Sequence, residues 1–247
     1  MAITEREGYI SGRVALEYLN AMRAIVGDHG VATLLRRSKL ISLINKIFSV
    51  RHERIFPVGG LAALSNAVID IFGESGLRTV VYTSAKASFQ PGFSDLQVVR
   101  DSQRLIRGVW EREDGWTILR EVYPDTETRF IFIHVALDMI AKALRSACGW
   151  QTAVHSDETH FFMDLMTGGE CSAGVRINST SGFYTLGIMR GGIRYLLQSD
   201  DYPCLEVECR TTGAAQCMFS VRKEKFSRAE QETGKTSFLR FPGSLAG

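Results

Sequence analysis

Residues 202–222 read YPCLEVECRTTGAAQCMFSVR, and this stretch decides the fold. It contains two runs of alternating side chains, 202–209 and 217–222, on either side of a short polar segment that bends at Gly213. Such a pattern predicts a β-hairpin in an antiparallel sheet. Alternation of apolar and polar residues, with a period of two residues, begins only after Gly149. We therefore expect the chain before that glycine to be mainly helical.

The hairpin carries three of the five cysteines of the chain. Strand alternation puts Cys204 and Glu206 on one face and Cys209 on the other, where Cys217 of the second strand can join it. Two thiolates that a turn brings together suit a zinc site or a redox function. Buried cysteines are also common core residues, so the spacing leaves both interpretations open.

Outward from the hairpin, the pattern predicts an α+β protein, with N-terminal helices followed by an antiparallel sheet that has helices packed on it. A long helix is expected over 126–148, with Asp125 or Thr126 as its N-cap, and the stretch 79–83 favours a strand although its neighbours would continue a helix. The other predicted elements are helices over 11–26, 57–72, 96–109 and 183–197, and strands over 151–155 and 159–166.

Three regions are expected along the chain. Residues 1–95 form a helical region that packs as part of the same domain, residues 96–222 form the α+β core, and residues 223–247 form a loose polar tail. In the 183–197 helix, Gly187 and Gly191 lie four residues apart, which predicts either close helix packing or a dimer contact.

Composition excludes several classes of protein. Hydrophobic residues make up 45% and charged residues 23%, and 29 Lys and Arg face 27 Asp and Glu for a net charge of +2. This balance gives no electrostatic reason to expect a nucleic acid or a membrane surface as partner. There is no long apolar span and no signal-peptide core, so we expect a cytoplasmic protein. An odd number of cysteines then favours reduced thiols or metal ligands over disulfides.

The hairpin residues also carry a resemblance. Glu206-Val207-Glu208-Cys209, then seven residues, then Cys217-Met218-Phe219-Ser220-Val221, resembles the closing hairpin of the 4-vinyl reductase domain family. The preceding glycine-rich helix stands where that family places one, and the helices through Phe89 resemble its stand-alone, hydrocarbon-binding members. The resemblance implies a fold like that of Golgi-transport tethering subunits and of the sensory domains of aromatic-responsive regulators. It also implies a buried pocket for a hydrophobic ligand, usually in a homodimer.

In the phenol-sensing relatives, a Glu and two Cys of this hairpin hold zinc together with an upstream Cys. Carried over to this chain, the implied zinc ligands are Glu206, Cys209 and Cys217. The segment 178–182, before the helix, has no cysteine to act as the fourth ligand, and Cys171 lies further back. Regular alternation also separates Glu206 from Cys209 unless the strand has a bulge.

The same regulators hold the phenol hydroxyl with a helix histidine and a strand aromatic, which correspond here to His134 and Phe162. We expect an apolar pocket lined by Phe130, His134, Leu137 and Phe162, although a histidine on an apolar helix face can also be an ordinary core residue. Phe162 lacks the donor that a tryptophan would supply, which favours a ligand larger or less polar than phenol.

The resemblance implies non-catalytic binding of a hydrophobic or tetrapyrrole-like molecule, with an accessory or carrier role in (bacterio)chlorophyll synthesis. One alternative is a ligand-responsive sensor or scaffold that acts through a partner protein. Another is a component of a vinyl-tetrapyrrole reductase. No nicotinamide or flavin fingerprint is recognisable in the sequence, so the residues themselves do not favour an enzyme.

Overall fold

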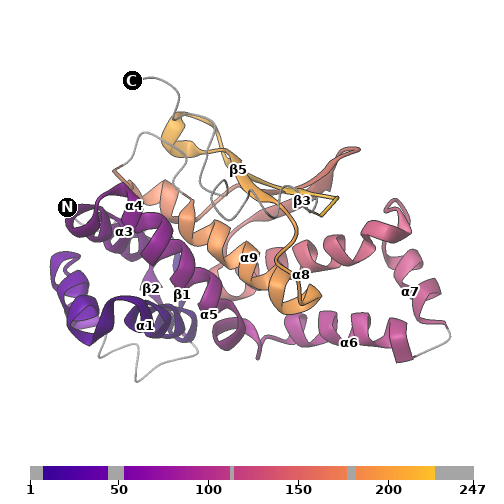
Figure 1. Ribbon diagram of the computed structural model, residues 1–247, viewed down its shortest axis with the longest axis horizontal. Helices are drawn as coiled ribbons and strands as arrows, with labels where there is room; N and C mark the ends of the chain where they lie inside the picture. Colours follow the sequence, from indigo (N-terminus) through magenta and orange to yellow (C-terminus); the bar gives the residue numbers. More distant parts are fainter. Residues whose placement is uncertain (1–7, 44–52, 112–113, 177–181, 226–247) are drawn as a thin grey trace.

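The computed structural model describes residues 8–43, 53–111, 114–176 and 182–225. It confirms the predicted α+β fold, with N-terminal helices followed by an antiparallel sheet that packs against helices (Figure 1). Residues 226–247, which make up most of the predicted tail, lie outside the described residues. Within the described ranges, no helix is both long and apolar enough to cross a bilayer.

The elements of the first half are β1 (Tyr9–Ser11), α1 (Gly12–Arg37), β2 (Arg54–Pro57), α3 (Val58–Phe72), α4 (Glu74–Gly76), η2 (Leu77–Tyr82), α5 (Thr83–Phe93), α6 (Gln97–Glu111) and α7 (Gly115–Val122). Those of the second half are η3 (Thr128–Phe130), α8 (Ile131–Cys148), β3 (Thr152–Ser156), β4 (His160–Leu165), η4 (Glu170–Ala173), α9 (Phe183–Leu197), β5 (Cys204–Glu208), η5 (Arg210–Thr212) and β6 (Cys217–Arg222).

The main sheet has the strand order β3-β4-β6-β5 and is antiparallel throughout. Phe161 and Met163 of β4 and Phe219 and Val221 of β6 are fully buried on its inner face. On this face α8 packs against β3 and β4, and α9 packs against β5 (Figure 1). The predicted hairpin therefore closes a sheet that rests on the two helices expected beneath it.

Close packing of α9 against η2 and α5 explains Gly187 and Gly191 of the 183–197 helix. A Cβ atom at Gly187 would lie 2.6 Å from the carbonyl oxygen of Tyr82, and one at Gly191 would lie 2.5 Å from that of Lys86. A side chain at either position would therefore push these helices apart. Of the two predictions for these glycines, the structure confirms close helix packing, here within one chain.

Two of the expected local features differ in the structure. The stretch 79–83, whose composition favours a strand, is helical, because η2 runs directly into α5. Val80 and Val81 are buried there, since η2 packs against α9 and α3, and tertiary packing overrides their β-propensity. The long helix starts later than predicted, with Phe130 at its N-cap and no side-chain cap, while Thr126 makes a different contact, described below.

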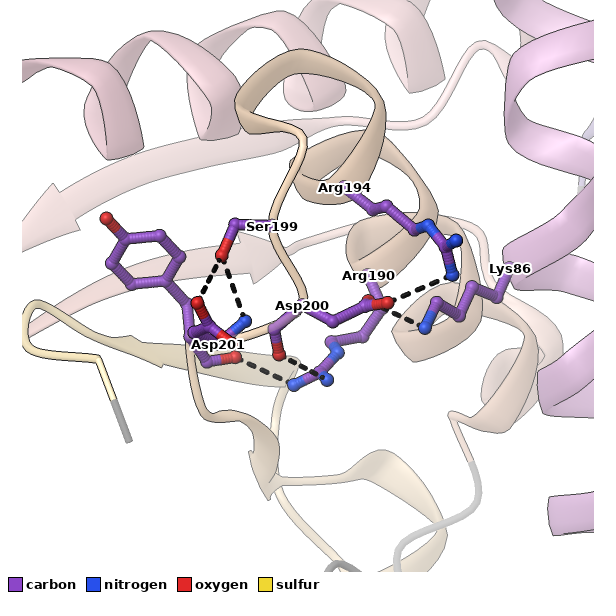
Figure 2. Close-up of polar contacts among 7 residues, drawn as sticks. Lys86, Arg190, Arg194, Ser199, Asp200 and Asp201 are labelled. Atoms are coloured by element: carbon purple, nitrogen blue, oxygen red, sulfur yellow. Dashed lines mark hydrogen bonds and ion pairs between the residues drawn. The ribbon is translucent and has the colours of Figure 1, made fainter. Parts of the chain in front are cut away.

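A buried arginine fixes the loop that leads from α9 into β5 (Figure 2). The guanidinium group of Arg190, on α9, donates to the carbonyl oxygens of Tyr202 at 2.7 Å and Asp200 at 3.0 Å. The carboxylate of Asp200 bridges Lys86 of α5 at 2.6 Å and Arg194 of α9 at 3.0 Å. These contacts hold the start of β5 against α5 and α9, and so position the first strand of the hairpin.

We predict that Arg190→Leu lowers the free energy of unfolding by about 2–4 kcal/mol, because it leaves two part-buried carbonyl groups without their charged donor. The control is Arg194→Leu, in which 63% of the arginine side chain is exposed and the loss should stay below about 1 kcal/mol. Arginine and leucine have similar helix propensities, so helix formation does not confound the comparison. Urea unfolding measures both variants, and equal losses would contradict the assigned role of Arg190.

Candidate metal centre and the predicted ligand site

Four potential metal ligands meet at one point in the described part of the chain: Cys171, Glu206, Cys209 and Cys217. Their donor atoms all lie within 4.8 Å of one another. The sulfur of Cys209 is 3.4 Å from that of Cys171 and 3.9 Å from that of Cys217, and the sulfur of Cys171 is 3.8 Å from Oε1 of Glu206. Tetrahedral zinc with bonds of about 2.3 Å to sulfur needs sulfur atoms roughly 3.8 Å apart, so this spacing fits.

A β-bulge brings Glu206 and Cys209 to the same side of the hairpin. The register of β5 against β6 shifts between Glu206 and Glu208, so that Glu206 faces Phe219 while Glu208 faces Met218. The extra residue, Val207, inverts the alternation after it. Glu206 and Cys209 are therefore both buried on the inner side, although regular alternation would separate them.

Cys171 reaches the cluster through a tight turn after β4. Gly168 and Gly169 have φ angles of +83° and +79°, in a region that side chains other than glycine rarely adopt. Arg210, at the start of η5, donates to the carbonyl oxygens of Leu165 at 3.0 Å and Gly168 at 3.2 Å. This turn and its arginine therefore hold η4 beside the hairpin, with Cys171 in place.

Contacts on either side of Cys171 fix its position. Its neighbour Glu170 is fully buried and caps the N-terminus of α9, because its carboxylate accepts from the backbone N–H of Tyr184 at 2.6 Å and from the hydroxyl of Thr185 at 3.0 Å. On the other side, Asn66 of α3 donates to the carbonyl oxygen of Gly174 at 3.2 Å. The segment that carries Cys171 is thus attached to two helices.

The electrostatics of the cluster favour a cation. Burial, followed by the neighbouring Cys209, raises the pKa of Glu206 to about 9, against the effect of a 2.9 Å hydrogen bond from the N–H of Gly182. The pKa of the Cys171 thiol also lies far above its ordinary value. The first cause is its hydrogen bonds with the thiols of Cys209 and Cys217, and the second is burial. A bound divalent cation would displace these protons and neutralise the charge they leave.

The donor set suits zinc, since three thiolates and one carboxylate match its preference for sulfur with nitrogen or oxygen. Four protein ligands leave no open position for water or substrate, which is the arrangement of a structural zinc site rather than a catalytic one. The other two cysteines, Cys148 and Cys204, are buried and free, and neither belongs to the cluster.

The structure places the predicted metal ligands Glu206, Cys209 and Cys217 together, and it adds Cys171, which the spacing did not single out. Thirty-five residues separate Cys171 from Glu206 in the chain. The one local signal in the sequence is a lone cysteine directly after Gly168-Gly169-Glu170, a turn followed by a helix-capping carboxylate.

Of the predicted pocket residues, Phe130, His134 and Leu137 lie along the first turns of α8, and Phe130 and Leu137 are buried. The imidazole of His134 is half-buried, and its Nδ1 lies 2.7 Å from the hydroxyl of Thr126. Its ring contacts that of Phe161 in β4, with centroids 5.2 Å apart. Burial lowers the pKa of His134 below its ordinary value, which favours the neutral imidazole.

The structure does not bring Phe162 to these residues. Phe161 faces α8, and alternation therefore turns Phe162 to the outer face of the sheet, where its ring stacks on that of His155 with centroids 5.1 Å apart. The strand aromatic that meets His134 is Phe161. The sequence already showed the conflict, because Phe161, Met163 and Leu165 form the more apolar face of this strand.

Comparison with known proteins gives a limited result. No family model matches the chain, and no curated protein matches it. One solved structure to which it is similar is the crystal structure of the phenol-responsive sensory domain of the transcription activator PoxR with phenol. The identity is 12%, the match covers 78% of this chain and 87% of that one, and the TM-score is 0.41. The resemblance to the 4-vinyl reductase domain family stays a prediction.

Cys171 and Cys204 form a matched pair for testing the metal centre, because each is 7% exposed. We predict that Cys171→Ser weakens zinc binding by more than about 100-fold, since it removes a ligand and not merely a group that orients one. Cys204→Ser should keep one zinc per chain.

Elemental analysis of protein purified without chelator, followed by competition with a chelator of known affinity, measures both variants. Equal zinc retention by the two variants would exclude Cys171 as a ligand. If the wild-type protein contained no zinc, the cysteines of the cluster would be ordinary buried core residues.

Proposed function

We propose that this protein binds a hydrophobic small molecule without catalysing a reaction, and that a structural zinc ion holds its fold closed. The observation that carries the zinc assignment is the buried set of three thiols and one carboxyl at the spacing of a tetrahedral site. A site closed by four protein ligands supplies no Lewis acid to a substrate, so this metal serves the architecture.

Support for the binding role comes from the surroundings of His134. Its ring lies between the aromatic rings of Tyr123 and Phe161, with centroid distances of 4.7 and 5.2 Å. Among the described residues, no hydrogen bond engages its Nε2 atom, while Thr126 engages Nδ1. Apolar walls with one polar group that is free to bind are typical of small-molecule sites.

The resemblance seen in the sequence suggests particular forms of this function. One is a carrier role for a tetrapyrrole-like molecule, and another is a sensor or scaffold that acts on a partner protein. In either role the protein would be a homodimer. One feature favours the sensor among these. Phe161, which contacts His134, lies in β4, and β4 pairs with β6, where Cys217 of the metal cluster faces Leu165. A ligand that moved Phe161 would act on the strand pair to which Cys217 of the metal cluster belongs.

The binding role is tested with His134→Leu. We predict that this variant binds Nile red, a neutral apolar dye with a carbonyl acceptor, about tenfold more weakly than wild type, because one hydrogen bond is lost. Its free energy of unfolding should stay within about 1–2 kcal/mol of wild type, since the residue is half-buried and leucine keeps its apolar contacts. Fluorescence titration and urea unfolding give the two quantities.

The control is His155→Leu on the outer face of the sheet, where 49% of the histidine side chain is exposed. It should bind the dye as wild type does. The binding site would lie elsewhere if His134→Leu also bound the dye like wild type.

A further inference from the structure

The ammonium group of Lys223, just after β6, lies over two aromatic rings, that of Phe161 in β4 and that of Phe130 at the start of α8. It is 5.0 Å from the ring centroid of Phe161 and 5.5 Å from that of Phe130. Among the described residues, it donates one hydrogen bond, to the backbone carbonyl oxygen of Asp157 at 2.6 Å. A lysine ammonium group has three hydrogen-bond donors and is strongly hydrated in water. Because Lys223 is half-buried over phenyl rings, its ammonium group can still donate hydrogen bonds to a ligand.

The charged groups next to Phe130 and His134 are each paired, whereas Lys223 has no carboxylate partner among the described residues. Arg129, which stacks on the ring of Phe130, is paired with Glu127 at 3.0 Å. Asp138, near His134, is paired with Lys142 at 2.7 Å and accepts from the hydroxyl of Tyr123. Within the described residues, Lys223 has no carboxylate at ion-pair distance, so its ammonium group can still form an ion pair with an anionic ligand.

The carboxylate of Asp157 does not fill that role. It accepts from the backbone N–H groups of Thr159 and His160, both at 2.7 Å, and these hydrogen bonds close the turn between β3 and β4. The lysine bonds only the main-chain oxygen of this residue.

His134 complements the lysine. When the neutral imidazole accepts the hydroxyl proton of Thr126 at Nδ1, its Nε2 carries the remaining proton and is a hydrogen-bond donor. A donor and an unpaired cation beside apolar rings together suit a ligand with an anionic head and an apolar body. When such a ligand is buried, the ammonium group and the imidazole would pair with its negative charge.

We propose that Lys223 determines ligand specificity, and that the ligand is a hydrophobic carboxylic acid whose carboxylate is held by the ammonium group of Lys223 and Nε2 of His134. This inference rests on the binding role proposed above and narrows it to one class of ligand. The aromatic rings of Phe130 and Phe161 contact the apolar part next to the head group.

The test compares acids with alcohols of matched shape by isothermal titration calorimetry. The probes are octanoate against 1-octanol and 4-phenylbutyrate against 4-phenyl-1-butanol, applied to wild type, Lys223→Met and Lys225→Met. Lys225 is a matched control, because its ammonium also lies over an aromatic ring, that of Tyr202 at 5.5 Å, while it pairs with Asp201. Methionine keeps the apolar stem of lysine and removes the charge.

Wild type should bind the acid of at least one pair about tenfold more tightly than the alcohol. Lys223→Met should bind both members equally, and Lys225→Met should keep the preference. If wild type binds acid and alcohol equally, the assigned ligand class is wrong, while the binding role stands. The same holds if Lys223→Met keeps the preference for the acid. If neither the four probes nor Nile red bind, the binding role itself fails.

Discussion

The contact between η4 and the closing hairpin is the constraint on which the rest of the structure depends. Three thiols and a carboxyl are buried within 4.8 Å of one another, and they come from three separate segments of the chain. Without a cation, such a cluster crowds polar and ionisable groups together in the interior, which is costly. With a cation, the same groups join η4, β5 and β6 into one unit, and their deprotonation becomes favourable.

Neighbouring elements also depend on this contact. Glu170 and Cys171 are adjacent, so the residue that caps α9 and the residue that completes the cluster are positioned together. α9 in turn packs against η2 and α5 at Gly187 and Gly191, and holds the entry to β5 through Arg190. The metal centre therefore stands at the junction of the helical layers and the sheet, and the surroundings of His134 connect to it through β4 and β6.

Much of this fold could be predicted from local patterns. The 183–197 helix and the second strand of the hairpin agree with the structure residue for residue, since their periods are regular and glycines or turns bound them. The spacing of the hairpin paired Cys209 with Cys217, and the resemblance to the 4-vinyl reductase domain family added Glu206 as an implied ligand. Cys171 could not be named in this way, since its approach depends on two glycines at positive φ and on contacts with α3 and α9.

The remaining differences have similar causes. Alternation assumes a regular strand, so it could not foresee the bulge at Val207 that joins Glu206 to Cys209. The resemblance suggested Phe162 as the partner of His134, whereas the more apolar face of the strand turns Phe161 toward α8. Propensity suggested a strand at 79–83, where packing against α9 imposes a helix.

X-ray absorption at the zinc edge, on protein purified without chelator, tests the metal centre, because it reports the atoms bound to the metal. We predict a first shell of three sulfur atoms at about 2.3 Å and one oxygen at about 2.0 Å. A first shell of nitrogen and oxygen atoms only, or protein that contains no zinc, would contradict this prediction.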